Sequence, residues 1–138
     1  MFSKRYIAIF IMAVFMLSFV PASSAAPCPK DSPANCSKSV CITYVKCNGN
    51  EYIKITNNKA SAQSVYKWKV SIQSSKKQYV IPYKPLLKSK QSIYIYTGKG
   101  YTRGNVMYMG LKGDIIKCKG ETVSLNASCG KLVSVKRI

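Results

Sequence analysis

Short segments in which apolar and polar residues alternate follow one another along this chain, and they restrict it to a β-fold. In residues 51–57, Ile53 and Ile55 alternate with Tyr52 and Lys54. A period of two residues is typical of a strand with one buried face. No segment after residue 26 has the 3.6-residue period of an amphipathic helix. The pattern therefore predicts an all-β domain of antiparallel strands.

Eight such strands are predicted, separated by asparagine, glycine and proline turns. They cover residues 40–47, 51–57, 65–72, 78–81, 92–97, 106–109, 122–126 and 132–137. Residues 127–130 form a hairpin turn before the last strand. Eight short strands with regular turns indicate a β-sandwich or a barrel.

The alternation also predicts which side chains point into the domain. In residues 40–47, one face carries Val40, Ile42 and Tyr44, and Val45 lies on the opposite face. Residues 65–72 are interpreted as a single strand with one apolar and one basic face. The apolar face carries Tyr66, Trp68, Val70 and Ile72. We therefore expect Trp68, the only tryptophan, to lie in the core.

The first residues are interpreted as an export signal. Lys4 and Arg5 precede an apolar run of 14 residues, 7–20, and small residues follow to position 26. This arrangement is typical of a signal peptide, with cleavage expected after Ala25. A membrane anchor is the alternative, but the run is shorter than the roughly 20 residues of a spanning helix. The predicted organisation is a signal peptide at 1–25, a cysteine- and proline-rich arm at 26–39 and a β-domain at 40–138. The protein is expected to be secreted, with no later membrane segment.

Six cysteines predict disulfides, because an even number in a short exported chain is typical of a cross-linked domain. They are Cys28, Cys36, Cys41, Cys47, Cys118 and Cys129. If Cys41 and Cys47 end one strand, they lie roughly 20 Å apart, too far for a mutual disulfide. Cys118 or Cys129 is then a partner for one of them, while Cys28 and Cys36 could attach the arm; the full pairing stays open. The sequence contains no histidine and no Cys-x-x-Cys pair, so neither a metal site nor a cofactor is expected.

Positive charge is the second strong signal. Without Lys4 and Arg5, 20 basic residues remain against four acidic residues, a net charge of +16. Such a field attracts anionic polymers and surfaces. Of these basic residues 18 are lysines, which act as point charges, so we expect salt-sensitive binding without base-sequence readout. The alternative is that the charge only keeps the protein soluble.

Catalysis is not expected. The chain has no histidine for a triad, and a carboxylate pair would have to come from four acids. Asp31 falls in the arm and Asp114 in a glycine turn. Glu51 and Glu121 each stand beside a turn, where we expect them to bond turn amides or lysines.

Over roughly residues 40–136 the chain resembles the lamin tail domain. The resemblance is carried by residues 50–57, by Trp68 in the next strand, by the aromatic-x-hydrophobic-proline step at 79–82 and by the glycine-capped strand at 93–100. Residues 107–110, 120–125 and 130–133 follow in the order of the family. The resemblance implies an immunoglobulin-like β-sandwich with no catalytic activity. It also implies a module that contacts nucleic acid or proteins in lamins and that serves adhesion or targeting in exported microbial proteins.

Candidate contact residues are basic groups near turns and aromatic rings on strands. The candidate polyanion contacts are Lys67, Lys69, Lys76, Lys77, Lys84, Lys88, Lys90, Lys99, Arg103, Lys117 and Lys119. Tyr94 and Tyr96 share a face opposite Ile93 and Ile95, and either pack across strands or offer a surface to sugars or bases. Tyr101, between Lys99 and Arg103, completes a group suited to phosphate or sulfate.

The sequence therefore predicts a secreted, non-enzymatic binding or adhesion module for an anionic polymer or surface, such as nucleic acid, an acidic glycan, a wall polymer or a membrane surface. Two rival hypotheses are a cationic antimicrobial or toxin-like effector and a structural matrix protein. No amphipathic helix supports the effector. Oligomeric state and the use of the glycosylation sequons at Asn35 and Asn126 stay open.

Overall fold

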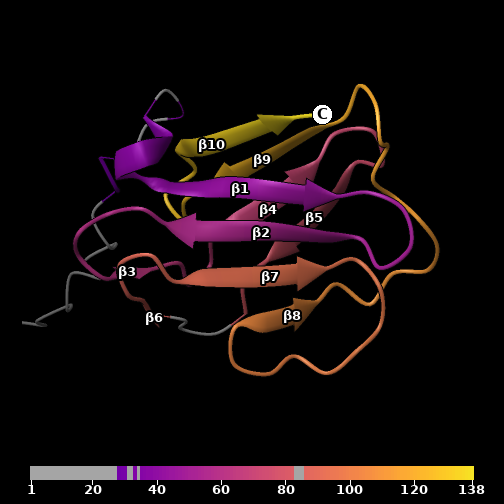
Figure 1. The fold of residues 1–138 in the computed structure, drawn as a ribbon, viewed down its shortest axis with the longest axis horizontal. Helices are drawn as coiled ribbons and strands as arrows, with labels where there is room; N and C mark the ends of the chain where they lie inside the picture. Colours follow the sequence, from indigo (N-terminus) through magenta and orange to yellow (C-terminus); the bar gives the residue numbers. More distant parts are fainter. Residues whose placement is uncertain (1–27, 31–32, 34, 83–85) are drawn as a thin grey trace, which may run out of the picture.

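The computed structural model describes residues 28–30, 33, 35–82 and 86–138. The predicted signal peptide and its cleavage site lie outside these residues. The regular structure of the described residues consists of ten strands and one short 3₁₀-helix, η1 (Cys36–Lys38) (Figure 1). The strands are β1 (Val40–Lys46), β2 (Tyr52–Asn57), β3 (Gln63–Ser64), β4 (Lys69–Ile72), β5 (Lys77–Val80), β6 (Leu86–Leu87), β7 (Ser92–Tyr96), β8 (Val106–Tyr108), β9 (Thr122–Asn126) and β10 (Leu132–Arg137).

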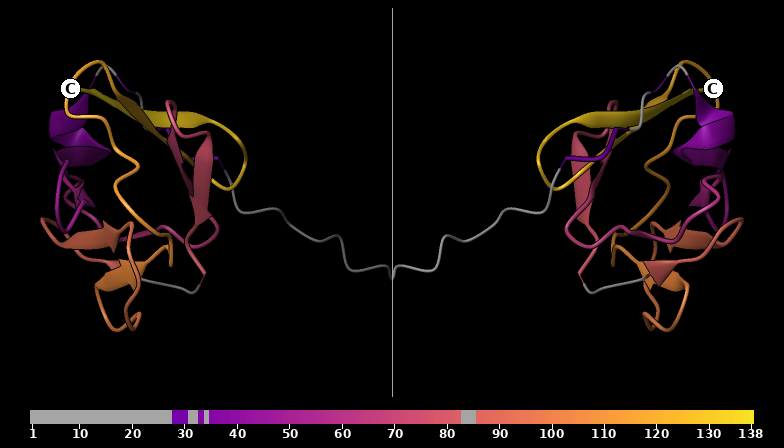
Figure 2. Two further views of the ribbon diagram at one scale, coloured as in Figure 1. Left: turned by 90° about the vertical axis from the view of Figure 1, so that its right-hand side faces the viewer. Right: turned by 90° about the vertical axis from the view of Figure 1, so that its left-hand side faces the viewer.

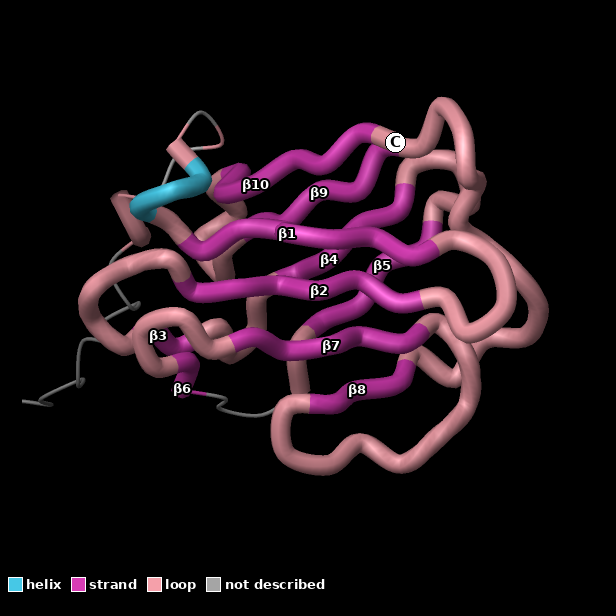
Figure 3. The backbone as a smooth tube through the Cα atoms, viewed as in Figure 1, coloured by secondary structure: helices cyan, strands magenta, loops and turns pink. Residues whose placement is uncertain are grey.

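Two four-stranded sheets pack face to face, which confirms the predicted β-sandwich (Figures 1 and 2). The first sheet has the order β1-β2-β7-β8 and the second the order β10-β9-β4-β5. Their strands pair antiparallel, except that β8 runs parallel to β7 because the loop at 97–105 carries the chain back along the sheet. A small third sheet pairs β3 with β6 (Figure 3).

The core lies between the two large sheets. Ile53, Ile55, Ile93 and Ile95 come from the first sheet, and all four are fully buried. The second sheet contributes Val70, Ile72, Val123 and Leu125, and Trp68 is also buried, with 3% of its surface exposed. At the edge where β1 and β10 lie side by side, the Ile42 amide donates to Ser134 Oγ at 3.0 Å. This bond links the two sheets.

Asn57, which ends β2, has a buried side chain that organises two loops. Its Nδ2 donates to the carbonyl oxygens of Ser61 at 2.9 Å and Leu87 at 2.8 Å, and its Oδ1 accepts from the Lys59 amide at 3.0 Å. A buried amide with its donors and acceptor satisfied stabilises the loops that it joins. This contact explains physically why the strand at 51–57 ends in asparagine.

The orientation predicted for residues 40–47 is wrong beyond Ile42. A β-bulge between Ile42 and Tyr44 inserts one residue into β1 and reverses the alternation. Val45 is therefore buried, whereas Tyr44 is 51% exposed. Tyr44 joins the outer face of the first sheet.

The prediction of a single strand over residues 65–72 is also wrong. Tyr66 and Lys67 form a turn, with Lys67 at a φ of 60°, and β4 starts only at Lys69. The turn shifts the alternation, so Val65 rather than Tyr66 is fully buried. The two-residue strands β3 and β6 were not predicted, because so few residues carry no periodicity.

Three disulfides hold the arm and one loop to the sandwich. They join Cys28 to Cys129, Cys36 to Cys41 and Cys47 to Cys118, with Cα–Cα distances of 5.6, 5.6 and 5.2 Å. The first two attach the described part of the arm. The third fixes the loop between β8 and β9 to the end of β1.

Candidate functional site

The outer face of the first sheet carries an array of tyrosines and lysines, here named the tyrosine face. Its members are Tyr44, Lys46, Tyr52, Lys54, Tyr94, Tyr96 and Tyr108. The array follows directly from strand alternation, because buried isoleucines alternate with these residues in β2 and β7. The buried Met107 orients Tyr108 to the same side.

Cross-strand pairing arranges these side chains in two rows. In the first row, Lys46 pairs with Tyr52, which pairs with Tyr96, which pairs with Tyr108. The second row runs from Tyr44 through Lys54 to Tyr94. Beyond the second row, the hydroxyl groups of Thr43, Thr56 and Ser92 hydrogen-bond in a chain, with oxygen–oxygen distances of 2.8 and 2.7 Å.

The tyrosine rings contact one another along the face. Ring centroids are 5.8 Å apart for Tyr44 and Tyr52, 5.3 Å for Tyr52 and Tyr96, and 5.2 Å for Tyr96 and Tyr108. The Lys54 ammonium lies 5.7 Å from the centre of the Tyr94 ring, close enough for a cation–π interaction. The rings therefore support one another, and none needs a partner from another part of the chain.

The polar groups of this face are not used by the fold. The five tyrosine hydroxyls of this face form no hydrogen bond with any described protein group. None of these hydroxyls is among the buried polar atoms that lack a partner. Within the same part of the chain, neither Lys46 nor Lys54 has an ion pair. Phenol hydroxyls and ammonium groups open to solvent are available to a ligand.

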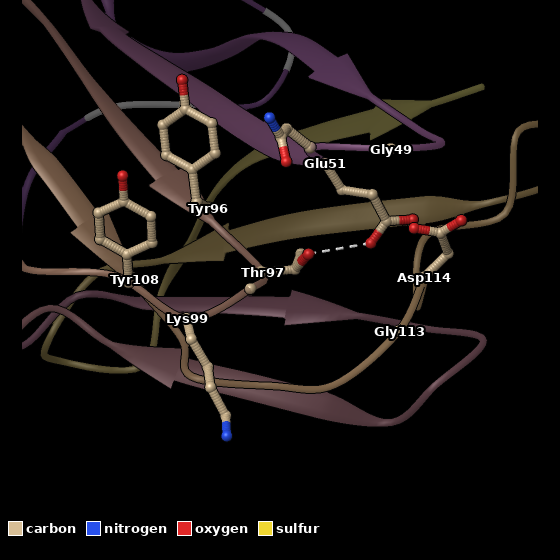
Figure 4. A pocket seen from close by; sticks show the side chains of 10 residues that line it. Gly49, Glu51, Tyr96, Thr97, Lys99, Tyr108, Gly113 and Asp114 are labelled. Atoms are coloured by element: carbon tan, nitrogen blue, oxygen red, sulfur yellow. Dashed lines mark hydrogen bonds between the residues drawn. The ribbon is translucent and has the colours of Figure 1, made fainter.

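A pocket of about 410 Å³ opens at one end of the first row (Figure 4). Tyr96 and Tyr108 line it together with Lys99, Asp114 and Gly113, and the backbones of Gly49 and Gly98 also contribute. The two tyrosine rings are within 20° of parallel, and Figure 4 shows them side by side with their hydroxyls pointing the same way. They form one wall of the pocket.

Gly100 allows the Tyr108 ring to occupy this wall. A Cβ built at Gly100 would lie 2.3 Å from Cε1 of Tyr108, far inside van der Waals contact. Any other residue at position 100 would therefore displace the ring or the loop. The glycine turn seen in the sequence thus serves the packing of an aromatic side chain.

The opposite wall belongs to residues 110–120, here named the clamped loop, which two buried glutamates hold in place. The Glu51 carboxylate is 1% exposed and accepts hydrogen bonds from the amides of Ile115 and Ile116, both at 2.9 Å, and from Thr97 Oγ1 at 3.0 Å. The dashed line in Figure 4 marks the bond from Thr97. Glu51 therefore bonds turn amides, as expected, and none of the described lysines.

Glu121 has the same role at the other end of the clamped loop. Its carboxylate, also 1% exposed, accepts from the amides of Lys117 at 3.2 Å, Ser74 at 3.0 Å and Thr122 at 3.0 Å, and from the Ser74 hydroxyl. Burial by itself raises the pKa of this carboxyl, but the hydrogen bonds from Ser74, Lys117 and Thr122 outweigh burial and lower the pKa. Two carboxylates thus receive three consecutive loop amides, at 115, 116 and 117.

The other predicted contact residues do not form one site. Lys67 and Lys69 line a shallow polar pocket on the second sheet with Ser71 and Gln78. Tyr101 is 95% exposed, away from the ring contacts of the tyrosine face. Lys84 lies outside the described residues. The remaining predicted cations lie in separate parts of the chain: Lys76 in the turn between β4 and β5, Lys77 at the start of β5, Lys88 and Lys90 before β7, Arg103 before β8, and Lys117 and Lys119 in the clamped loop.

The structure brings together Tyr94, Tyr96 and Lys99 from the predicted set, and it adds five residues that were not predicted as contacts. These are Tyr44, Lys46, Tyr52, Lys54 and Tyr108. The alternation of Tyr52 and Lys54 with buried isoleucines was a usable signal. For Tyr44, Lys46 and Tyr108 the sequence carries no such signal, because their positions depend on the bulge in β1 and on the parallel pairing of β8.

The described residues contain no group of three or more His, Cys, Asp or Glu side chains that could hold a metal ion. The same part of the chain has no helix long and apolar enough to cross a membrane.

Fold and surface together define a disulfide-bonded, immunoglobulin-like binding or structural module. The family model of the lamin tail domain matches residues 33–137, so the chain belongs to the lamin tail domain family. This match confirms the resemblance and extends it into the arm. No curated protein matches the chain significantly.

Proposed function

We propose that this protein is an exported, non-enzymatic module that attaches to an anionic polymer or surface through the tyrosine face. The observation that carries the proposal is the concentration of unused hydrogen-bond donors on one flat surface. Five phenol hydroxyls and two ammonium groups gather on the outer side of one sheet, and none of them forms a hydrogen bond or an ion pair with the described residues of the protein.

The distribution of acidic groups supports an anionic partner. Glu51 and Glu121 are buried and, among the described residues, accept only from amide and hydroxyl donors, so neither pairs with a described lysine. The excess of 22 basic over four acidic residues in the full sequence is therefore almost uncompensated at the surface. A polymer that neutralises these charges gains free energy by releasing its counterions.

Export is supported by the disulfides and by the sequence before them. Three disulfides are stable in oxidising compartments and rare in reducing ones. The segment at 1–25 has the order of a signal peptide. A non-enzymatic role agrees with the family, whose domains are immunoglobulin-like and bind or support other structures.

The test is retention of the oxidised 26–138 protein on heparin and on DNA columns in a salt gradient. We expect the unmodified protein to elute at a salt concentration well above the physiological one. The double variant Lys46→Gln/Lys54→Gln should elute at a clearly lower salt concentration, and Lys69→Gln/Arg137→Gln should show a smaller decrease. Both variants remove two positive charges, but only the first removes them from the tyrosine face. Elution of the unmodified protein at or below physiological salt would contradict the proposal.

A further inference from the structure

We propose that Asn35 is the acceptor of an N-linked glycan and that Asn126, the other candidate asparagine, is not. Two Asn-x-Ser sequons occur in the chain, at residues 35–37 and 126–128. Such a modification rests on the export that the proposed function includes, but it does not require binding of a polyanion. The two sequons lie in very different surroundings, and this difference decides between them.

Asn35 lies at the surface immediately before η1, outside the strands. Cys36 and Ser37, the other two residues of its sequon, are also exposed. The Ser37 hydroxyl donates to Asn35 Oδ1 at 3.0 Å, whereas Asn35 Nδ2 forms no hydrogen bond with the described residues. The amide nitrogen is the atom that carries the sugar in a glycosylated asparagine. In Asn35 this atom has no competing bond among those residues.

The segment around Asn35 is held to the domain without the help of its side chain. The Cys36–Cys41 disulfide ties it to β1, and Asn58 Nδ2 donates to the Cys36 carbonyl oxygen at 2.8 Å. The Asn35 side chain takes part in neither contact. A large, solvated group on this residue therefore displaces none of the described contacts that hold the segment.

Asn126 stands in a part of the fold that resists the same modification. It is the last residue of β9, an inner strand of the second sheet, with Lys69 of β4 and Leu132 of β10 opposite it. Its Nδ2 donates to the Gly130 carbonyl oxygen at 3.2 Å across the turn that leads to β10. Ala127, the middle residue of this sequon, is buried. An enzyme that must take the sequon into its own cleft would have to open the sheet here.

The reaction needs a sugar donor and an enzyme of the secretory pathway. The donor is an oligosaccharide joined to a lipid through pyrophosphate, and the enzyme is an oligosaccharyltransferase. Asn35 Nδ2 forms a bond to the anomeric carbon of the first sugar, and the lipid pyrophosphate leaves with the electron pair of the broken carbon–oxygen bond. A base of the enzyme takes one proton from the nitrogen. Asn35 Oδ1 keeps its lone pairs, so it can still accept from Ser37.

A glycan on Asn35 is compatible with a ligand on the tyrosine face. Asn35 and η1 precede the start of β1, whereas Gly49 and Asn50, which line the pocket, follow its end (Figure 1). The glycan would therefore stand at the opposite end of β1 from the pocket.

The test expresses the full-length chain in a eukaryotic host that attaches N-linked glycans. One form keeps its own residues 1–25, and a second form carries an established signal peptide of the host in their place. Electrophoretic mobility before and after peptide:N-glycosidase treatment detects the glycan. Mass spectrometry then locates it, because the enzyme converts the glycosylated asparagine to aspartate. We expect a glycan on Asn35 in most chains and none on Asn126.

Variants of the second form separate the two sequons. Asn35→Gln and Ser37→Ala should each abolish the mobility change, and Ser37→Thr, which keeps the sequon, should retain it. Asn126→Gln should leave the mobility change intact. Asn50→Gln changes an exposed asparagine outside any sequon and is the matched control, so it should also have no effect. Circular dichroism melting curves of the purified variants confirm that each is folded.

Three results would overturn the inference. These are an Asn35 without glycan in the form with the host signal peptide, a mobility change that survives Asn35→Gln and disappears in Asn126→Gln, and glycans on both asparagines. A different result would count against export alone. If the glycan is present with the host signal peptide and absent with the protein's own residues 1–25, the export in the proposed function fails while Asn35 stands as the acceptor.

Discussion

The tyrosine face and the clamped loop meet at one pocket, yet they use polar side chains in opposite ways. In the clamped loop, the polar groups of Glu51 and Glu121 are buried, and each carboxylate accepts at least three hydrogen bonds. On the tyrosine face, the phenol hydroxyls and the two ammonium groups point outward and form no hydrogen bond or ion pair with other described residues. Buried polar groups without partners are costly, so the first arrangement stabilises the fold. The second adds no hydrogen bond or ion pair to the fold, and this difference supports the proposal that the face serves a ligand.

Loss of the Cys47–Cys118 disulfide should lower stability more than loss of the Cys36–Cys41 disulfide. It closes 71 residues of sequence, whereas Cys36–Cys41 closes five. From loop-closure entropy we expect Cys47→Ser/Cys118→Ser to lower the free energy of unfolding by about 4 kcal/mol and Cys36→Ser/Cys41→Ser by about 2 kcal/mol. Guanidinium unfolding curves measure both. Equal losses would show that the disulfide in the clamped loop has no special role.

Removal of the Glu121 carboxylate should separate the two regions. Glu121→Ala leaves the amides of Ser74, Lys117 and Thr122 without an acceptor, and we expect a loss of about 3 kcal/mol in the free energy of unfolding. Ser74→Ala removes one donor and should cost about 1 kcal/mol. Salt elution from heparin should stay unchanged at a temperature where the variant is folded. A large drop in elution salt would mean that the clamped loop itself contacts the polymer.

Substitution of Gly100 should have the reverse effect and act mainly on binding. In Gly100→Ala, the new methyl group would collide with the Tyr108 ring and move it from the pocket wall. We expect the affinity for a heparin tetrasaccharide, measured by calorimetry, to fall about tenfold, equal to about 1.4 kcal/mol, with a smaller change in unfolding free energy. If the double variant Gly100→Ala/Tyr108→Ser binds no more weakly than Tyr108→Ser alone, the glycine acts through the ring. Additive losses would contradict that explanation.

Acid should weaken the clamped loop by a small amount that Glu121 explains. The pKa of the Glu121 carboxyl is lower in the folded protein than its ordinary value of 4.5. Its contribution to stability is therefore complete above that ordinary value and is lost as the pH falls through the lower folded value. Unfolding free energies measured from pH 6 downward should decrease below about pH 4.5, and Glu121→Gln should reduce this decrease. An unchanged pH dependence in Glu121→Gln would contradict the assignment.

Much of the fold could be predicted from the sequence, because residue alternation reports burial directly. The alternation in β2 and β7 identified strands and separated their two faces, and the predicted bounds of β9 and β10 match the structure. The bulge in β1 and the turn at Tyr66 and Lys67 could not be predicted, since each changes the phase by one residue without a glycine or proline to mark it.

The candidate site was harder to predict, since it depends on which strands are neighbours. Tyr52, Tyr96 and Tyr108 lie in three strands that are distant in the sequence, and only the sheet order brings them together. Lysines, in contrast, are spread over the whole chain, so their number indicated an anionic partner without showing where it binds. Tyr101 was predicted from its neighbours Lys99 and Arg103, but the fold places its ring outside the aromatic row.

The most direct test of the account is an NMR titration of the isotope-labelled, oxidised 26–138 protein with a heparin tetrasaccharide. The account predicts that amide shifts concentrate in β1, β2, β7 and β8 around the tyrosine face, and in residues 97–100 and 113–114 beside the pocket. The outer residues of the second sheet, such as Lys69, Ser71 and Ser124, should shift little. Shifts centred on the second sheet, or spread evenly over all lysines, would contradict the claim that the tyrosine face is the binding surface.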